Sequence, residues 1–331
     1  MTSTTTPART PAAAGYLRAE DCRLEDLLEV VGAGTDLADY PHADAVAQGV
    51  LVYDSAGLRG TMVDDDTRRA VHSEVARALA DGPGIVVFQA AFEHEVVDRV
   101  SEAFERMIAA EKADGGPAGD HFAAPGANDR VWNALEKLAV TDPEAFVDYY
   151  ANDIVALAAA AWLGPGYQVT SQVNVVNPGG AGQTVHRDYH LGFQSPKASA
   201  EFPAHVHALS PVLTLQGAVA HCDMPVESGP TLYLPHSQKY APGYLAYWLP
   251  EFQEYFVGHH VQLPLLKGDA VFFNPALFHA AGTNHTSDVR RMANLLQVSS
   301  PFGRAMETVD RRRVVEAVYP ALLARKATGM P

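Results

Sequence analysis

The second half of the chain, from residue 167 on, alternates short β-rich runs with turns. Runs such as YQVTSQVNVV, AVFFN and RMANLLQVS are rich in Val, Phe and Thr, and Gly, Pro, Asn and Asp separate them. Strands at this spacing are typical of a barrel or jelly roll, because parallel strands would need a crossover connection between them. The pattern therefore predicts a mainly β core over about 167–300.

The first half is predicted to be largely helical. Apolar residues recur at helical spacing over several stretches, and GIVVFQA at 84–90 is expected to be a strand. The sequence LGPG at 163–166 separates the two halves. The expected elements are helices at about 66–82, 93–112, 131–139, 143–162 and 308–325, a loop at 113–130, a disordered tail at 1–14, and one domain over 15–331 whose helical part covers about 15–166.

Charge and cysteine content limit the function classes. The 331 residues include 24 basic and 39 acidic side chains, which gives a net charge of −15. Such a chain is a poor candidate for binding nucleic acids or anionic membranes, because both need clustered Lys and Arg. Two cysteines cannot form a disulfide framework, so a cytoplasmic protein is the simplest expectation.

A possible metal site lies in the predicted barrel. In an extended segment, His186 and Asp188 of the HRD triplet point to the same face. His279 follows a further strand and supplies a third candidate ligand. Two imidazoles and one carboxylate form the facial triad of non-haem Fe(II) oxygenases, which leaves positions open for a co-substrate and dioxygen. The similar triplet His221-Cys222-Asp223 is interpreted as a strand end and a turn.

The co-substrate 2-oxoglutarate would need a cation for its distal carboxylate, and Arg suits a carboxylate better than Lys. Arg290 and Arg291 lie 11 and 12 residues after His279. Adjacent residues on a strand face opposite sides, and periodicity alone does not choose between them.

The motifs HRD (186–188), ESGPTLYLPHSQK (227–239) and KGDAVFFNPALFHAAGTN (267–284), followed by Arg290, resemble the phytanoyl-CoA dioxygenase family of Fe(II)- and 2-oxoglutarate-dependent oxygenases. The resemblance covers about 68–300. It implies a double-stranded β-helix, or jelly roll, with iron held by His186, Asp188 and His279. The family's spacing of eleven residues implies that 2-oxoglutarate binds Arg290 and decides against Arg291. The chain departs from the family pattern at Ala281, where some members carry a hydroxyl group.

The resemblance implies a dioxygenase that uses O2 and releases succinate and CO2. Hydroxylation of an unactivated C–H bond in a small metabolite of secondary metabolism is the expected reaction. Asp188 disfavours halogenation, since related halogenases replace this carboxylate with a small residue. Two alternatives remain open at this point. One is a cupin-like metal-dependent isomerase or hydrolase without 2-oxoglutarate, and the other is a catalytically silent binding protein.

Further candidate residues come from strands and from the 113–130 loop. Gln172, Asn174 and Thr231 alternate with apolar residues, so they either contact the co-substrate or face solvent. The loop offers polar and aromatic groups of the kind that close over active sites. The candidate substrate contacts are His121, Asn128, Arg130, Trp132, Arg187 and Tyr233.

Overall fold

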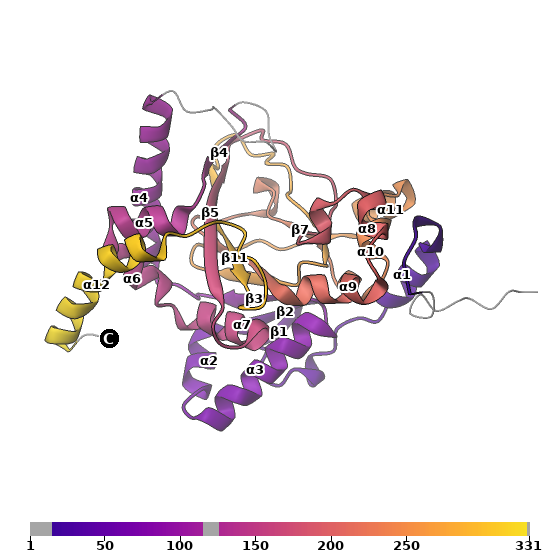
Figure 1. The fold of residues 1–331 in the computed structure, drawn as a ribbon, viewed down its shortest axis with the longest axis horizontal. Coiled ribbons are helices and arrows are strands. Elements are labelled where there is room, and N and C mark those ends of the chain that lie inside the picture. The colour runs from indigo at the N-terminus through magenta and orange to yellow at the C-terminus, as the bar shows by residue number, and fades with distance from the viewer. Residues whose placement is uncertain (1–14, 115–125, 330–331) are drawn as a thin grey trace, which may run out of the picture.

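A computed structural model describes residues 15–114 and 126–329, and Figure 1 shows its architecture. The predicted tail at 1–14 lies outside the described residues. The larger sheet has the strand order β1-β2-β3-β9-β6-β11-β5-β4, and its neighbours are antiparallel except β2 and β3. Its strands are β1 (Ala45–Ala47), β2 (Val50–Asp54), β3 (Ile85–Gln89), β4 (Asn128–Val131), β5 (Gln168–Val176), β6 (Thr214–Ala220), β9 (Ala270–Phe273) and β11 (Arg291–Ser299).

A smaller sheet has the order β10-β7-β8. It consists of β7 (Leu232–Leu234), β8 (Val261–Gln262) and β10 (Phe278–Ala280). The chain passes back and forth between these two sheets, which together form a double-stranded β-helix. This confirms the fold predicted from the sequence.

Helices cover the outer face of the larger sheet and the ends of the smaller one (Figure 1). The α-helices are α1 (Leu24–Val31), α2 (Ser55–Thr61), α3 (Asp65–Ala80), α4 (His94–Ala113), α5 (Ala134–Thr141), α6 (Pro143–Tyr150), α7 (Asp153–Leu163), α8 (Pro196–Ala200), α9 (Ala204–Leu209), α10 (Gly243–Ala246), α11 (Pro250–His259) and α12 (Arg311–Thr328). Short 3-10 helices are η2 (Ala19–Asp21), η3 (Leu37–Asp39), η4 (Leu191–Phe193), η5 (Ser210–Leu213), η6 (Val226–Ser228) and η7 (Ser237–Lys239).

The strands of the larger sheet divide their side chains between two environments. In β3, Val86 and Phe88 pack in the main core with α3, α4 and α7, whereas Ile85 and Val87 face the smaller sheet. The same alternation runs along β9, where Phe272 joins the main core and the next residue faces the other side. Because both faces are covered, these strands read as continuous apolar runs.

The N-terminal half is less helical than the sequence predicted. Strands β1 and β2 extend the larger sheet, and β4 occupies the end of the expected 113–130 loop by pairing with β5. The expected helix at 143–162 is two helices, because Asn152 accepts hydrogen bonds from Ile154 N and Val155 N and begins α7. In the part of the chain that is described, no helix is long and apolar enough to cross a bilayer.

Candidate metal and co-substrate site

The three candidate metal ligands meet at the junction of two extended segments. His186 pairs with His279 as an isolated antiparallel bridge, with backbone N–O distances of 3.0 and 3.2 Å in the two directions. Two residues farther along, Asp188 N donates to Pro275 O. The period of two along an extended chain therefore turns His186 and Asp188 to one side, as predicted from the sequence.

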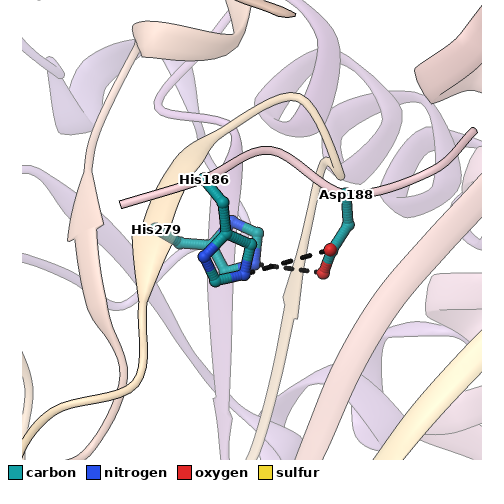
Figure 2. A group of neighbouring side chains, drawn as sticks. All are labelled: His186, Asp188 and His279. Carbon is teal, nitrogen blue, oxygen red and sulfur yellow. Dashed lines mark ion pairs between the residues drawn. The ribbon is translucent and has the colours of Figure 1, made fainter. Parts of the chain in front are cut away.

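Figure 2 shows both imidazole rings directed at the Asp188 carboxylate. Nε2 of His279 lies 3.3 Å from Asp188 Oδ2, and Nε2 of His186 lies 3.9 Å from Asp188 Oδ1. All three ligand atoms lie within 4.8 Å of one another. These separations suit one ion bonded to each atom at about 2.1 Å. The donor set also matches the two-histidine, one-carboxylate facial triad.

Hydrogen bonds set the tautomer of each histidine. Nδ1 of His186 lies 2.9 Å from Thr184 O, and Nδ1 of His279 lies 2.8 Å from Leu277 O. A carbonyl oxygen accepts only, so Nδ1 carries a proton in each ring and Nε2 is the nitrogen that faces the site and would bind a metal. Burial, together with the neighbouring His279, lowers the pKa of His186 and keeps its ring neutral.

Asp188 is held as a carboxylate. Burial alone would raise its pKa, but the hydrogen bond with His279, the two neighbouring imidazoles and the Gln216 amide outweigh burial and lower the pKa to about 2. Gln216 Nε2 donates to Asp188 Oδ2. The arrangement thus presents an anionic oxygen beside two imidazole Nε2 atoms, and a divalent metal that binds there would replace a proton shared between His279 and Asp188.

A cavity of about 840 Å³ opens beside these ligands, between the two sheets. Its walls are mostly apolar and include Val87, Val271 and Phe273. Several residues predicted as co-substrate or substrate contacts line this cavity. They are Gln172, Asn174, Thr231, Tyr233, Arg130 and Trp132.

Arg291, not Arg290, faces the cavity. The Arg291 guanidinium is buried, at 7% exposure, and its Nη1 donates to Ser228 O and Gly282 O. Arg290 points to the opposite side of β11, where it pairs with Glu105 and Asp129. The sequence predicted that Arg290 binds 2-oxoglutarate, but Arg290 does not line the cavity and its guanidinium is engaged in these ion pairs. The family's spacing of eleven residues after His279 does not select the arginine at the cavity, because β11 directs Arg291, twelve residues after His279, into the cavity.

Two other predicted substrate contacts, Arg187 and Asn128, do not line the cavity. Arg187 is fully buried behind the site, and its Nη2 donates to Ser237 O and Tyr240 O. Asn128 is buried next to the cavity wall, where its amide donates to Asn174 Oδ1. His121 lies outside the described residues.

The similar triplet around His221 takes no part in the site, as the sequence interpretation expected. His221 is buried in the main core, with its ring nitrogens 2.8 Å from Ser101 Oγ and 2.8 Å from Tyr149 Oη. The candidate metal group found among the described residues consists of His186, Asp188 and His279 alone.

Sequence reasoning missed Gln216, the partner of Asp188, and the aromatic residues Phe193 and Trp248 at the cavity. A signal for Gln216 was present, since it is a polar residue within the apolar strand β6. Phe193 and Trp248 lie in segments whose sequence shows no periodicity, so nothing in the pattern pointed to them.

Comparison with known proteins adds a family and a fold. The sequence model of the family described as "Phytanoyl-CoA dioxygenase (PhyH)" matches residues 80–292, nearly two thirds of the chain. No curated protein sequence gives a significant match. The crystal structure of AviO1 from Streptomyces viridochromogenes Tue57 is similar with a TM-score of 0.50 and 18% identity, over 72% of this chain and 97% of that one.

Two further similar structures contain relevant ligands. The epimerase SnoN, in complex with Fe3+, alpha ketoglutarate and nogalamycin RO, has a TM-score of 0.46 and 19% identity, over 70% of this chain and 84% of that one. HygX from Streptomyces hygroscopicus, with nickel and 2-oxoglutarate bound, has a TM-score of 0.48 and 13% identity, over 71% and 90%.

Proposed function

Because the chain belongs to the phytanoyl-CoA dioxygenase family of iron- and 2-oxoglutarate-dependent enzymes, we propose that it hydroxylates an unactivated C–H bond of a small metabolite. His186, Asp188 and His279 would hold Fe(II). When bound, the iron supplies the oxidising chemistry that couples O2 and 2-oxoglutarate to substrate oxidation, with release of succinate and CO2. Asp188 fills the position that a halide would need, which favours hydroxylation over halogenation.

The observation that carries this proposal is the buried cation of Arg291. Among the described residues, no carboxylate lies within ion-pair distance of its guanidinium. An unpaired buried charge is costly, and burial lowers the pKa of Arg291 to about 10. A dicarboxylate co-substrate that extends from the metal site would supply the missing anion.

Two hydroxyl groups extend this subsite. Tyr233 and Thr231 line the same cavity, and the pKa of Tyr233 is raised by burial while Thr231 and the Arg291 charge oppose that rise. We assign all three residues to the distal carboxylate of 2-oxoglutarate. The planar guanidinium would orient the carboxylate, and the hydroxyl groups would donate to its remaining lone pairs.

The cavity favours a small substrate over a coenzyme A ester. Its volume is typical of a site for one compact organic molecule. Apart from the two histidine ligands, the basic residues that line it are Arg130 and Arg291. Once Arg291 binds the co-substrate, one guanidinium remains, which is too few for the several phosphates of coenzyme A. We therefore favour a small metabolite of a secondary pathway as the substrate. The two unpaired cysteines agree with an enzyme of the reducing cytoplasm.

Residues in the wall and at the rim of the cavity have further proposed roles. Apolar side chains such as Val271 and Phe273 would exclude water from the reacting C–H bond. At the rim, the Arg130 guanidinium lies 5.0 Å from the centre of the Trp132 ring. That pair would orient a polar substrate by stacking and hydrogen bonding.

Isotope labelling tests the reaction type. The purified enzyme, loaded with Fe(II) and 2-oxoglutarate, is screened with metabolite pools for compounds that accelerate succinate release under ¹⁸O2. Hydroxylation predicts one ¹⁸O atom in succinate and one in the oxidised product. A labelled succinate with an unlabelled epimerised, cyclised or desaturated product would overturn hydroxylation. Turnover independent of 2-oxoglutarate would instead favour the cupin-like alternative.

A further inference from the structure

Gln216 uses the two ends of its carboxamide in different ways. The side chain is buried, at 8% exposure, and lines the cavity from β6. Its Nε2 donates to Asp188 Oδ2. The amide nitrogen is therefore the end that faces Asp188, and Oε1 is the other end of the amide.

The other end of this amide has no partner. Gln216 Oε1 is buried and accepts no hydrogen bond within the described part of the chain. A buried carbonyl oxygen that accepts nothing is unfavourable, so a native protein normally provides a donor for it. Gln216 lines the cavity and contacts a metal ligand, so a donor group of a substrate that packs against this wall would supply the missing partner of Oε1.

A second acceptor lies beside it. Gln297 is directly opposite Gln216 in the β6–β11 ladder and also lines the cavity. Its Oε1 is likewise buried without a hydrogen-bond partner among the described residues. Their cavity-lining neighbours, Ala218 and Leu295, offer no side-chain donor to either oxygen. The wall thus carries two buried amide oxygens on paired residues, and no described residue donates a hydrogen bond to either oxygen.

We propose that Gln216 is a specificity-determining residue whose Oε1 accepts a hydrogen bond from a hydroxyl or amine group of the substrate. This inference rests on the proposed function, since it places the substrate in the same cavity as the metal ligands. It names the substrate class more closely, as a ring- or chain-shaped metabolite with a hydrogen-bond donor close to the carbon that reacts. Gln297 provides the acceptor for a second donor of the same molecule.

The test uses three probes of similar size. Cyclohexanol carries a hydroxyl donor, cyclohexylamine carries an amine donor, and methoxycyclohexane carries no donor. Their dissociation constants are measured by ligand-observed NMR with the metal-free full-length protein. We expect the wild-type protein to bind at least one donor probe about 5- to 10-fold more tightly than methoxycyclohexane, as a hydrogen bond to a buried acceptor predicts. The donor probe that binds more tightly shows whether the substrate donor is a hydroxyl or an amine group.

Matched variants locate the effect. Gln216→Met keeps the side-chain length and removes the acceptor, so the preference for the donor probe should fall below about 2-fold. Leu295→Met changes the same wall without changing a polar atom and should keep the preference. If Gln216→Met does not fold, Gln216→Asn serves instead, because it withdraws the oxygen from the cavity by one methylene group.

Equal binding of the three probes to the wild-type protein, or no detectable binding of either donor probe, would overturn this inference. So would a preference that survives in Gln216→Met. The same preparation is also titrated anaerobically with Fe(II) and 2-oxoglutarate. If Fe(II) and 2-oxoglutarate form their visible complex but the protein does not prefer the donor probes, only the role of Gln216 is refuted and the proposed function is not. Donor preference in metal-free protein that forms no such complex supports Gln216 and refutes the proposed function.

Discussion

Arg290, just before β11, and Arg291, the first residue of β11, direct their guanidinium groups to opposite sides of the sheet. Arg291 is buried in the cavity beside the candidate metal ligands, whereas Arg290 pairs with Glu105 on α4 and with Asp129 on β4. Two chemically identical neighbours therefore have separate tasks. Arg291 is a buried cation that the proposed function assigns to 2-oxoglutarate, and Arg290 forms ion pairs that join α4 and β4.

This relationship predicts different effects of the same substitution. Arg291→Gln should weaken 2-oxoglutarate binding by about 30- to 1,000-fold, because it removes a charge-assisted contact worth about 2–4 kcal/mol in a buried site. The dissociation constant is measured by calorimetry on anaerobic Fe(II)-loaded protein.

Arg290→Gln is the matched control. Its ion pairs are partly exposed, so the substitution should cost less than about 1 kcal/mol of unfolding free energy and leave 2-oxoglutarate binding within about 2-fold. A large loss of affinity in Arg290→Gln, with little change in Arg291→Gln, would reverse our assignment.

The metal site predicts a ligand-dependent stability. Fe(II) and 2-oxoglutarate together should raise the Tm of the wild-type protein, since a ligand at 100 times its Kd adds about 2.7 kcal/mol. Asp188→Ala should abolish that rise, because it removes the one anionic ligand of the set. Differential scanning fluorimetry under nitrogen measures both proteins. A full metal-induced shift in Asp188→Ala would place the metal elsewhere.

His221 predicts a pH dependence of stability. Asn294 donates to Tyr149 Oη, so the Tyr149 hydroxyl donates its own proton to His221 Nε2. Ser101 Oγ donates to Val97 O, so it accepts a hydrogen bond from His221 Nδ1. This network fits a neutral ring, and complete burial lowers the pKa of His221 to about 3. Between pH 6.5 and 3 the unfolded chain binds a proton that the native state does not, so stability falls with pH by up to about 1.4 kcal/mol per unit.

His221→Gln measures that contribution. The variant should be less stable than the wild-type protein at pH 8, because it disturbs a fully hydrogen-bonded core position. Its disadvantage should shrink as the pH is lowered from 6.5 to 4.5, since it has no imidazole to protonate. Urea denaturation at several pH values gives the two curves, and parallel curves would show that His221 does not titrate in this way.

Two Gly→Ala substitutions are predicted to have opposite signs. On β6, a Cβ at Gly217 would lie 2.5 Å from the Phe272 ring and 2.9 Å from Val271 O, so Gly217→Ala should destabilise the protein by about 1–3 kcal/mol. On α11, a Cβ at Gly258 would meet no atom within 4 Å. Gly258→Ala should therefore stabilise the protein by about 0.5–1 kcal/mol. Denaturant midpoints decide the matter, and a neutral Gly217→Ala would contradict the close packing of β6 on β9.

The sequence revealed the parts of the fold that depend on local pattern. The alternation of β-rich runs with turns predicted β5, β9 and β11 closely, and the period of two placed His186 and Asp188 on one face. Strands β1 and β2 were missed because they are formed by pairing at the sheet edge, where β2 pairs with β3 and β1 pairs with β2. Helices α8–α11 lie in irregular segments of the barrel half and carry no clear periodicity.

The parts of the site that follow from residue spacing were predictable from the sequence. The parts that depend on contacts between distant segments were not. The choice between Arg290 and Arg291 requires the register of β11 against β5, which pairs Arg291 with Val176. Arg187 was predicted to be a candidate substrate contact, yet the β7–α10 connection folds over it and supplies two carbonyl acceptors. No local pattern encodes such contacts, because their partners lie about fifty residues away.

The most direct test of this account is an anaerobic titration of the metal-free protein with Fe(II) and 2-oxoglutarate, followed by visible absorption. We predict a weak charge-transfer band that needs both additions and is absent in His186→Ala. Its half-saturation should shift to much higher 2-oxoglutarate concentrations in Arg291→Gln and stay unchanged in Arg290→Gln. A wild-type protein that binds Fe(II) but forms no band with 2-oxoglutarate would contradict the account, as would a band that persists in His186→Ala.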